Sequence, residues 1–415
     1  MEKLTAFVQE HMGDDLTRLV LDRKKWPDID IDLAVSCIQS RRKLKGKVQE
    51  WFSNPSLIFP AGLSAEQCSS TATAIYKARV AACIAVHSEI PGWRLADLTG
   101  GLGVDSWMFS QMATEVLYNE MQEKLCMAAS HNFAALGTDN IKISNLTAAP
   151  ETIDEILDGF DAHIVYMDPA RRGEGGKKVF LIEECTPDVL TLRDIIFKRC
   201  RHIFLKLSPM ADITMVCDRL GNTCREVHVV ATGGECKELL IWMDREWSGE
   251  YEVIAVELPA GYPENEAFTF SFKTSEEKSA PLTLLGKNAP LSHGYLFEPG
   301  KALMKAGSYN LISERFGLHK LGRSTHYYIT EDASKAETLK QLGKVYEIID
   351  CQPLDKRTMK TAGRDYPRAE VTARNIPMDT DTFRKKLGVT SGDDAHIFGL
   401  KSDTLGNLLI ITRRC

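Results

Sequence analysis

The sequence lacks several features that would place the chain in a membrane or outside the cell. It has no run of about 18 consecutive apolar residues, which a membrane-spanning helix requires. Its beginning, MEKLTAFVQEHMGDD, is polar and acidic, whereas a signal peptide is first basic and then apolar. The 11 cysteines are scattered, with no CxxC pair and no Cys/His cluster at zinc-binding spacing. We therefore expect a cytoplasmic protein with reduced thiols, no membrane anchor and no metal site.

The composition is that of an ordinary globular chain. With 415 residues, 44% hydrophobic and 26% charged, it is long enough for two or three domains with sizeable cores. The net charge of −6 argues against non-specific nucleic-acid binding by the chain as a whole. The charge is unevenly distributed, however, because residues 291–415 contain 20 Lys and Arg against 15 Asp and Glu. A basic C-terminal region beside an acidic body suits an anionic partner, although mixed charges also serve solubility.

The pattern of apolar and polar residues changes near Trp93. Residues 1–60 have a helical pattern that the prolines of SNPSLIFPAG interrupt. An alanine-rich helix is predicted from Ser64 to about Ser88, with Gln67 at the spacing of a capping box. After Trp93, short apolar runs alternate with helical stretches, which predicts an α/β fold whose parallel sheet has helices on both faces. These runs are RLADLTG, VLYNE, HIVYMDPA, HIFLKLSP and REVHVVA, and ELLIWMD would form a hairpin with the last of them.

A glycine-rich loop is the sharpest local signal. The segment DLTGGLGVD (97–105) follows an apolar strand and opens a helix. Gly100, Gly101 and Gly103 would let the backbone turn tightly and approach a ligand. Glu120 ends the next strand, where a carboxylate can accept hydrogen bonds from both hydroxyls of a ribose. The pattern predicts a nucleotide-like site, while a plain strand–helix turn is the alternative.

Two cofactors fit such a site. A dinucleotide would require GxGxxG and a helix N-terminus directed at a pyrophosphate, whereas Asp105 would place negative charge there. S-adenosylmethionine has no phosphate and tolerates acids around the loop. A nicotinamide-dependent oxidoreductase is therefore the weaker hypothesis. A non-catalytic RNA-binding module with a relict pocket is a second alternative, against which the intact Asp97, Glu120 and Asp168 argue.

The strand HIVYMDPARRG (163–173) adds a second group of polar residues at a strand end. Asp168 follows the strand beside the predicted switch point of the sheet, where a carboxylate can meet the reacting atom of a substrate. Pro169 removes a backbone donor there and leaves carbonyls free. An Asp-Pro pair is also a common loop initiator.

These motifs resemble the class I S-adenosylmethionine-dependent methyltransferases. More closely, the chain is similar to a bacterial group with a ferredoxin-like insert and a C-terminal THUMP-like domain. The segments that support the resemblance are DLTGGLGVDS (97–106), YNE (118–120), DPARRG (168–173), KLSPMADI (206–213), GGECKELL (233–240), LSAEQCSSTATAIYKA (63–78), HIFGLK and RKKLGV.

The resemblance implies a Rossmann-like, seven-stranded methyltransferase sheet. It also implies an RNA substrate, because THUMP domains belong to RNA-modifying enzymes. We expect a helical region at 1–62, a methyltransferase domain at 63–275, a ferredoxin-like segment at 276–320 and a THUMP-like domain at 321–415. The last would be a small α+β domain that contacts RNA. A protein or small-molecule substrate stays an alternative.

The residues after the strand HIVYM limit which atom of a substrate we expect to receive the methyl group. Amino-directed methyltransferases have an Asp/Asn-Pro-Pro-aromatic motif, whereas Ala170 and Arg171 stand at its last two positions here. The guanidinium of Arg171 can stack on a base or bind a phosphate. Uridine-C5 methyltransferases place a cysteine after the next strand, which here ends in Lys206-Leu-Ser208-Pro. We therefore expect methyl transfer to a base nitrogen or another atom other than C5.

The expected site residues fall into three groups. The expected catalytic residues are Asp168, Pro169 and Arg171. Residues expected to bind the cofactor are Gln67, Ser70, Asp97, Thr99, Gly100, Gly101, Gly103, Asp105, Glu120 and Asn145. Residues expected to bind the substrate are Arg172, Lys206 and Ser208.

Overall fold

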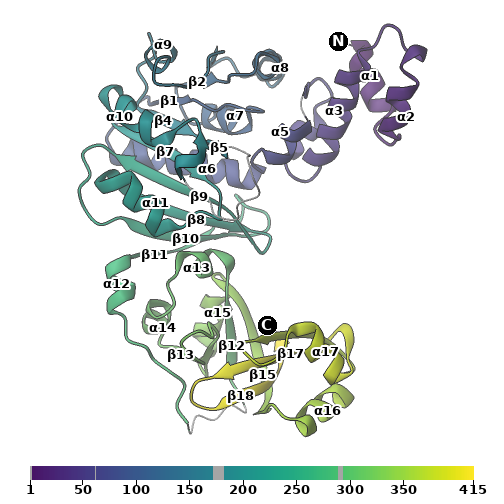
Figure 1. The fold of residues 1–415 in the computed structure, drawn as a ribbon, viewed down its shortest axis with the longest axis vertical. Coiled ribbons are helices and arrows are strands. Elements are labelled where there is room, and N and C mark those ends of the chain that lie inside the picture. Colours follow the sequence, from purple (N-terminus) through teal and green to yellow (C-terminus); the bar gives the residue numbers. More distant parts are fainter. Residues whose placement is uncertain (1, 61, 172–181, 288–292) are drawn as a thin grey trace. The chain divides into compact units, whose positions relative to one another are not determined.

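The computed structural model describes residues 2–60, 62–171, 182–287 and 293–415 (Figure 1). The chain divides into two compact units. The first comprises Met1–Val227 with Glu238–Gly249, and the second comprises His228–Lys237 with Glu250–Cys415.

The first unit begins with short helices, as the sequence predicts for residues 1–60. Aspartates cap two of them, because Asp15 accepts the amides of Thr17 and Arg18, and Asp30 accepts the amide of Leu33. These helices are α1 (Glu2–Glu10), α2 (Leu16–Leu21), α3 (Ile31–Leu44), α4 (Gln49–Ser53) and α5 (Gly62–Gln67), with a 3-10 turn η1 (Arg23–Lys25).

The predicted start of the alanine-rich helix at Ser64 is wrong. Helix α6 spans Thr71–His87 and has Ser70 as its N-cap, in a capping box with Thr73. The preceding helix α5 ends at Gln67, where Lys47 Nζ binds the backbone oxygens of Ala65 (3.3 Å) and Glu66 (2.5 Å). This contact comes from a distant part of the chain, so the local capping pattern could not show it.

A mostly parallel sheet forms the body of the first unit. Its strands are β1 (Arg94–Asp97), β2 (Glu115–Asn119), β3 (Ile141–Ser144), β4 (Ile164–Met167), β7 (His202–Leu207), β9 (Glu235–Asp244) and the first part of β8 (Cys224–Thr232). Within the described residues these seven strands lie in the order β3-β2-β1-β4-β7-β9-β8, with β9 antiparallel to β7. These seven strands match the predicted methyltransferase sheet, and β10 (Glu252–Leu258) and β11 (Phe268–Lys273) extend it beyond β8 to nine strands among the described residues.

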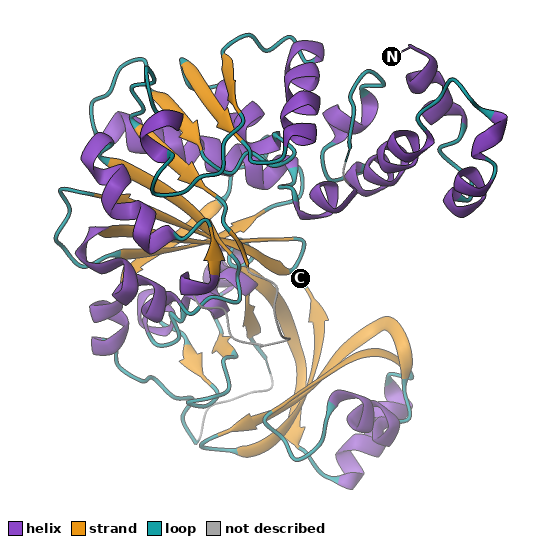
Figure 2. Ribbon diagram, turned by 45° about the horizontal axis from the view of Figure 1, so that its top comes forward, coloured by secondary structure: helices purple, strands orange, loops and turns teal. Residues whose placement is uncertain are grey.

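Helices connect the strands and cover both faces of this sheet (Figure 2). Strand β4 is buried along its whole length, as expected for a parallel strand between two helical layers. The remaining elements are α7 (Val104–Ser110), α8 (Glu123–Ala135), α9 (Ile153–Ile156), α10 (Val189–Arg199), α11 (Ile213–Leu220), η2 (Ile182–Glu184), η3 (Gly221–Thr223) and the short pair β5 (Ala170–Arg171) and β6 (Cys185–Thr186).

The strand register brings the predicted acidic residues to one edge. Asp97 at the end of β1 pairs with Tyr118 on β2 and with Tyr166 on β4, both in parallel register. Glu120 and Asp168 each follow two residues later. Because all three strands point the same way, their three carboxylates come to the same edge of the sheet.

The second unit contains a seven-stranded sheet, counted within the described residues, in the order β13-β14-β12-β15-β18-β17-β16. Neighbours Ile397 and Phe398 on β17 belong to two different apolar clusters, so both faces are covered. The elements of this unit are β10 (Glu252–Leu258), β11 (Phe268–Lys273), α12 (Thr274–Ser279), β12 (Tyr295–Pro299), α13 (Lys301–Ala306), α14 (Leu311–Phe316), β13 (His319–Lys320), β14 (Tyr328–Thr330), α15 (Ala333–Leu339), β15 (Gly343–Pro353), α16 (Lys356–Asp365), β16 (Arg368–Arg374), α17 (Thr380–Leu387), β17 (Thr390–Ser402) and β18 (Gly406–Arg414).

Candidate functional site

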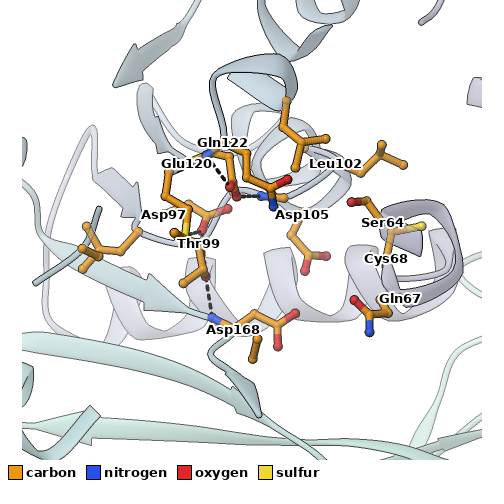
Figure 3. Close-up of a pocket in the computed structure, with 18 of the residues that line it drawn as sticks. Ser64, Gln67, Cys68, Asp97, Thr99, Leu102, Asp105, Glu120, Gln122 and Asp168 are labelled. Atoms are coloured by element: carbon orange, nitrogen blue, oxygen red, sulfur yellow. Dashed lines mark hydrogen bonds between the residues drawn. The ribbon is translucent and has the colours of Figure 1, made fainter. Parts of the chain in front are cut away.

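A cavity of about 250 Å³ opens at the carboxyl ends of β1, β2 and β4 (Figure 3). Its walls come from the loop 97–105, from 120–122, from the end of β4 and from the connection between α5 and α6. Ligands of open α/β sheets bind outside the carboxyl ends of the strands, where the strand order reverses. The order β2-β1-β4 contains this reversal, so the cavity occupies the expected place.

The glycines of the loop are required by its close packing. A Cβ atom on Gly100 would overlap the ring of Tyr118. Gly103 has φ 94°, and a Cβ atom there would lie 2.8 Å from Phe133 Cζ. Side chains at these positions would displace the loop, so the glycines keep the backbone beside the cavity.

Glu120 connects the end of β2 to the glycine loop. Its Oε2 accepts the amide of Gly101 and its Oε1 accepts the amide of Gln122, both at 2.9 Å. Each carboxylate oxygen keeps a further lone pair for a ligand. Asn145 was expected to bind the cofactor, but it does not line the cavity. Its amide instead donates to the backbone oxygen of Glu120 at 2.7 Å, so it supports the end of β2.

Asp97 is buried at the bottom of the loop. Its Oδ2 accepts the hydroxyl of Ser106 at 2.6 Å and its Oδ1 accepts the amide of Thr99 at 3.0 Å. Burial raises the pKa of Asp97 to about 7. This carboxyl group therefore changes charge near neutral pH, and a positively charged ligand would favour its ionised form.

Asp168 is joined to the loop after β1 and to β7. Its amide donates to Thr99 Oγ1 at 2.6 Å, and its Oδ2 lies 2.5 Å from Lys206 Nζ at the end of β7. Burial acts to lower the pKa of Lys206, but the carboxylates of Asp168 and Glu238 outweigh it and hold the pKa above its ordinary value. Lys206 therefore stays protonated beside Asp168. The expectation from sequence named both residues but did not anticipate their ion pair.

A buried lysine lies beneath the cavity. Lys77 on α6 has no exposed side-chain surface, and its Nζ lies 2.7 Å from Ser69 Oγ, 3.0 Å from Glu238 Oε2 and 3.3 Å from Asp105 Oδ1. The other oxygen of Asp105 accepts the hydroxyls of Ser69 (2.9 Å) and Tyr166 (3.0 Å). This network fixes Asp105 and Tyr166 in the cavity wall. Sequence reasoning missed it, although a lysine in the middle of an alanine-rich helix is a usable signal of a buried charge.

The connection between α5 and α6 forms one wall. Gln67 lines the cavity as expected, and Ser64, Cys68 and Ser69 line it as well. Burial raises the pKa of the Cys68 thiol, which keeps it neutral and unsuited to be a nucleophile. Ser70 was expected beside the cofactor, but it does not line the cavity, because its hydroxyl caps α6.

The remaining residues expected at the site differ in where they lie relative to the cavity. Pro169 is buried directly after Asp168. Ser208 lies beyond the cavity wall, where its hydroxyl accepts the amide of Met210 at 3.2 Å. The side chain of Arg171 and all of Arg172 lie outside the described residues.

Two absences hold for the part of the chain that the structure describes. No helix there has the length and apolar character needed to cross a bilayer. No three His, Cys, Asp or Glu side chains there gather into a group able to hold a metal ion.

Comparisons with known proteins concern the C-terminal part and the whole fold. Family models match a ferredoxin-like domain at residues 295–336 and a THUMP domain-like region at residues 343–414. No curated protein matches the chain. These ranges leave the domain boundaries expected at residues 62, 275 and 320 as predictions.

Solved structures resemble the chain to different extents. A protein from Porphyromonas gingivalis W83 described as a "putative methyltransferase" is 26% identical, with a TM-score of 0.84 over 100% of this chain and 98% of that one. An rRNA methylase from Streptococcus thermophilus is 13% identical, with a TM-score of 0.27 over 37% of this chain and 87% of that one, too low to support an argument. The chain is therefore a methyltransferase-fold protein with a ferredoxin-like domain followed by a THUMP-like domain.

Proposed function

We propose that the chain is a cytoplasmic class I S-adenosylmethionine-dependent methyltransferase that modifies RNA. The methyl group would pass to a base nitrogen or to another atom other than C5. The observation that supports this most directly is the convergence of Asp97, Glu120 and Asp168 around the glycine loop, at the carboxyl ends of three neighbouring strands.

The residues of the cavity fit S-adenosylmethionine. Glu120 has lone pairs available for the two ribose hydroxyls, and the loop at Gly100 and Gly101 allows a ligand to approach the backbone. Asp97 adds negative charge when it is ionised, which suits a ligand with an ammonium and a sulfonium group and no phosphate. When bound, this cofactor supplies a methyl group on a positively charged sulfur atom.

The substrate side of the cavity supports direct transfer. The Asp168 carboxylate can accept a hydrogen bond from the reacting group and orient its lone pair. Cys68 is the one cysteine of the described chain that lines the cavity, and its raised pKa makes a covalent C5 mechanism unsuitable. We keep Pro169 and Arg171 as proposed catalytic residues, and Arg172, Lys206 and Ser208 as proposed substrate contacts.

RNA as the partner is supported by the THUMP-like match and by the distribution of positive charge in that region. Helix α16 presents Lys356, Arg357 and Lys360 around a shallow groove, and none of the three forms an ion pair with another described residue. Three arginines of the region have acidic partners, because Arg364 pairs with Asp365, Arg368 with Asp394 and Arg384 with Glu370. The face of α16 is therefore the proposed phosphate-binding surface.

Two measurements test the proposal. Calorimetry should show binding of S-adenosylhomocysteine and none of NAD. The protein should then transfer labelled methyl groups from S-adenosylmethionine to total RNA of a strain that lacks the gene, and not to RNA of the parent strain, whose sites are already methylated. Binding of NAD alone, or transfer to protein and not to RNA, would contradict the proposal.

A further inference from the structure

The side chains of Asp168 and Lys206 form an ion pair beside the proposed methyl-transfer site. Asp168 lines the cavity and its side chain is 35% exposed, whereas Lys206 is not one of the lining residues and 15% of its side chain is exposed. An ammonium group has three N–H donors. Among the described residues, Asp168 is the one hydrogen-bond partner of Lys206 Nζ. The pair therefore presents a carboxylate acceptor and a charged donor side by side.

The charge of Lys206 is maintained by its surroundings. Glu238 and Asp105 act with Asp168 to raise its pKa, in spite of the opposing effect of burial. Glu238 and Asp105 also form ion pairs with Lys77, at 3.0 and 3.3 Å. A positive charge therefore remains next to the oxygen that would accept the substrate proton.

This positive charge discriminates between two kinds of nucleophile. An exocyclic amine becomes positively charged as it gains a methyl group, and a neighbouring ammonium group opposes that change. A lactam, in which a ring N–H stands beside a carbonyl, must instead lose its proton. Negative charge then develops on the carbonyl oxygen, and a preorganised ammonium donor stabilises it.

We propose that the methylated base is a lactam, such as guanine at N1 or uracil at N3, with its N–H bound by Asp168 and its oxygen bound by Lys206. This inference rests on the proposed RNA methyltransferase function. The ring N–H bond breaks and its proton passes to the Asp168 carboxylate. The ring nitrogen forms a bond to the methyl carbon, while the electron pair of the broken C–S bond stays on sulfur. Asp168 later releases the proton to water.

The product identifies the base. Total RNA from a strain lacking the gene is treated with the protein and S-adenosylmethionine, digested and examined by mass spectrometry. We expect a ring-nitrogen-methylated guanosine or uridine. A methyl group on the amine of adenosine, cytidine or guanosine would overturn the inference and leave the proposed function intact. If no RNA is methylated while S-adenosylhomocysteine still binds, the result contradicts the proposed RNA substrate and leaves the cofactor site supported.

A binding experiment provides a readout that does not depend on turnover. The probes are the oligoribonucleotides AAIAA and AAAAA, which differ only in the lactam or amine of the central base, with S-adenosylhomocysteine present. The wild-type protein should prefer AAIAA by about tenfold, the value of one charge-assisted hydrogen bond. K206M should reduce the preference, because the oxygen of the base loses its ammonium donor while Asp168 can still bind the ring N–H, whereas K198M, at an exposed lysine of α10, should keep it in full. Equal affinities in the wild-type protein, or an undiminished preference in K206M, would overturn the inference.

Discussion

Lys77 Nζ on α6 lies 3.0 Å from Glu238 Oε2 on β9, although the two residues are 161 positions apart in the sequence. Both side chains are almost completely buried beneath the cavity. The pair fixes α6, and with it the wall that contains Ser69, to the strand beside β7. A tertiary ion pair thus supports the site from below.

Removing Lys77 should destabilise the first unit. K77M would leave Glu238 and Asp105 as buried carboxylates without their cation, which costs about 3–5 kcal/mol of unfolding free energy. Urea unfolding followed by tryptophan fluorescence measures the loss. K77M/E238Q should recover part of it, because the glutamine carries no charge, and K124M on the exposed face of α8 should change little. Equal midpoints for K77M and K124M would contradict a structural role of the pair.

Glu120 should control cofactor affinity. In E120Q one backbone amide loses its acceptor and the proposed ribose contact loses its charge, so affinity for S-adenosylhomocysteine should fall by about 1.5–3 kcal/mol, or roughly 10- to 150-fold. Calorimetry measures the effect. E123Q, a nearby exposed glutamate, is the matched control. Unchanged affinity in E120Q would place the ribose elsewhere.

Cofactor affinity should depend on pH through Asp97. Its pKa of about 7 in the folded protein lies above its ordinary value, so the carboxyl group is protonated below pH 7 and ionised above it. A cationic ligand prefers the ionised form, so affinity should fall as pH decreases through about 7 and should be fully present above it.

Ser106 provides the check on that assignment. Its hydrogen bond to Asp97 lowers the pKa of this carboxyl group. S106A should therefore shift the midpoint of the affinity profile to higher pH, and calorimetry between pH 5.5 and 8.5 would show it. If the affinity of the wild-type protein did not change with pH, Asp97 would not interact with the positive groups of the cofactor.

The basic face of α16 should determine the salt dependence of RNA binding. K356E/K360E should weaken RNA binding and reduce the log–log salt slope by about 0.7 for each phosphate of a single strand that the variant no longer neutralises. K24E/K45E makes the same change in net charge at exposed lysines of the first unit and should leave the slope unchanged. Equal effects of the two variants would indicate a general charge effect.

Surface substitutions test the role of the C-terminal region in RNA binding better than removal of that region does. The seven-stranded sheet of the second unit includes β13 and β14 together with β15–β18. Leu321 is fully buried in one of its apolar clusters. A chain ending near residue 321 would expose that cluster, and its behaviour would report on folding as well as on RNA binding.

The positions of the glycine loop and of the strands could be predicted because their causes are local. Gly100, Gly101 and Gly103 lie close together in the sequence, and steric limits at φ and Cβ apply to each residue by itself. The parallel strands are continuous apolar runs, because helices cover both of their faces. Asp97, Glu120 and Asp168 could be assigned to one edge of the sheet for the same reason.

Tertiary structure alone decided which side chains meet there. Lys206 reaches Asp168, Lys77 reaches Glu238, and Asn145 binds the backbone of Glu120, because the order and register of the strands bring them together. Lys47, likewise, binds backbone oxygens of the last turn of α5, and Ser70 caps α6. The sequence by itself determined where the acids and glycines of the site lie along the chain. The fold decided which charges neutralise each other, since Coulomb pairing depends on distance in space and on burial.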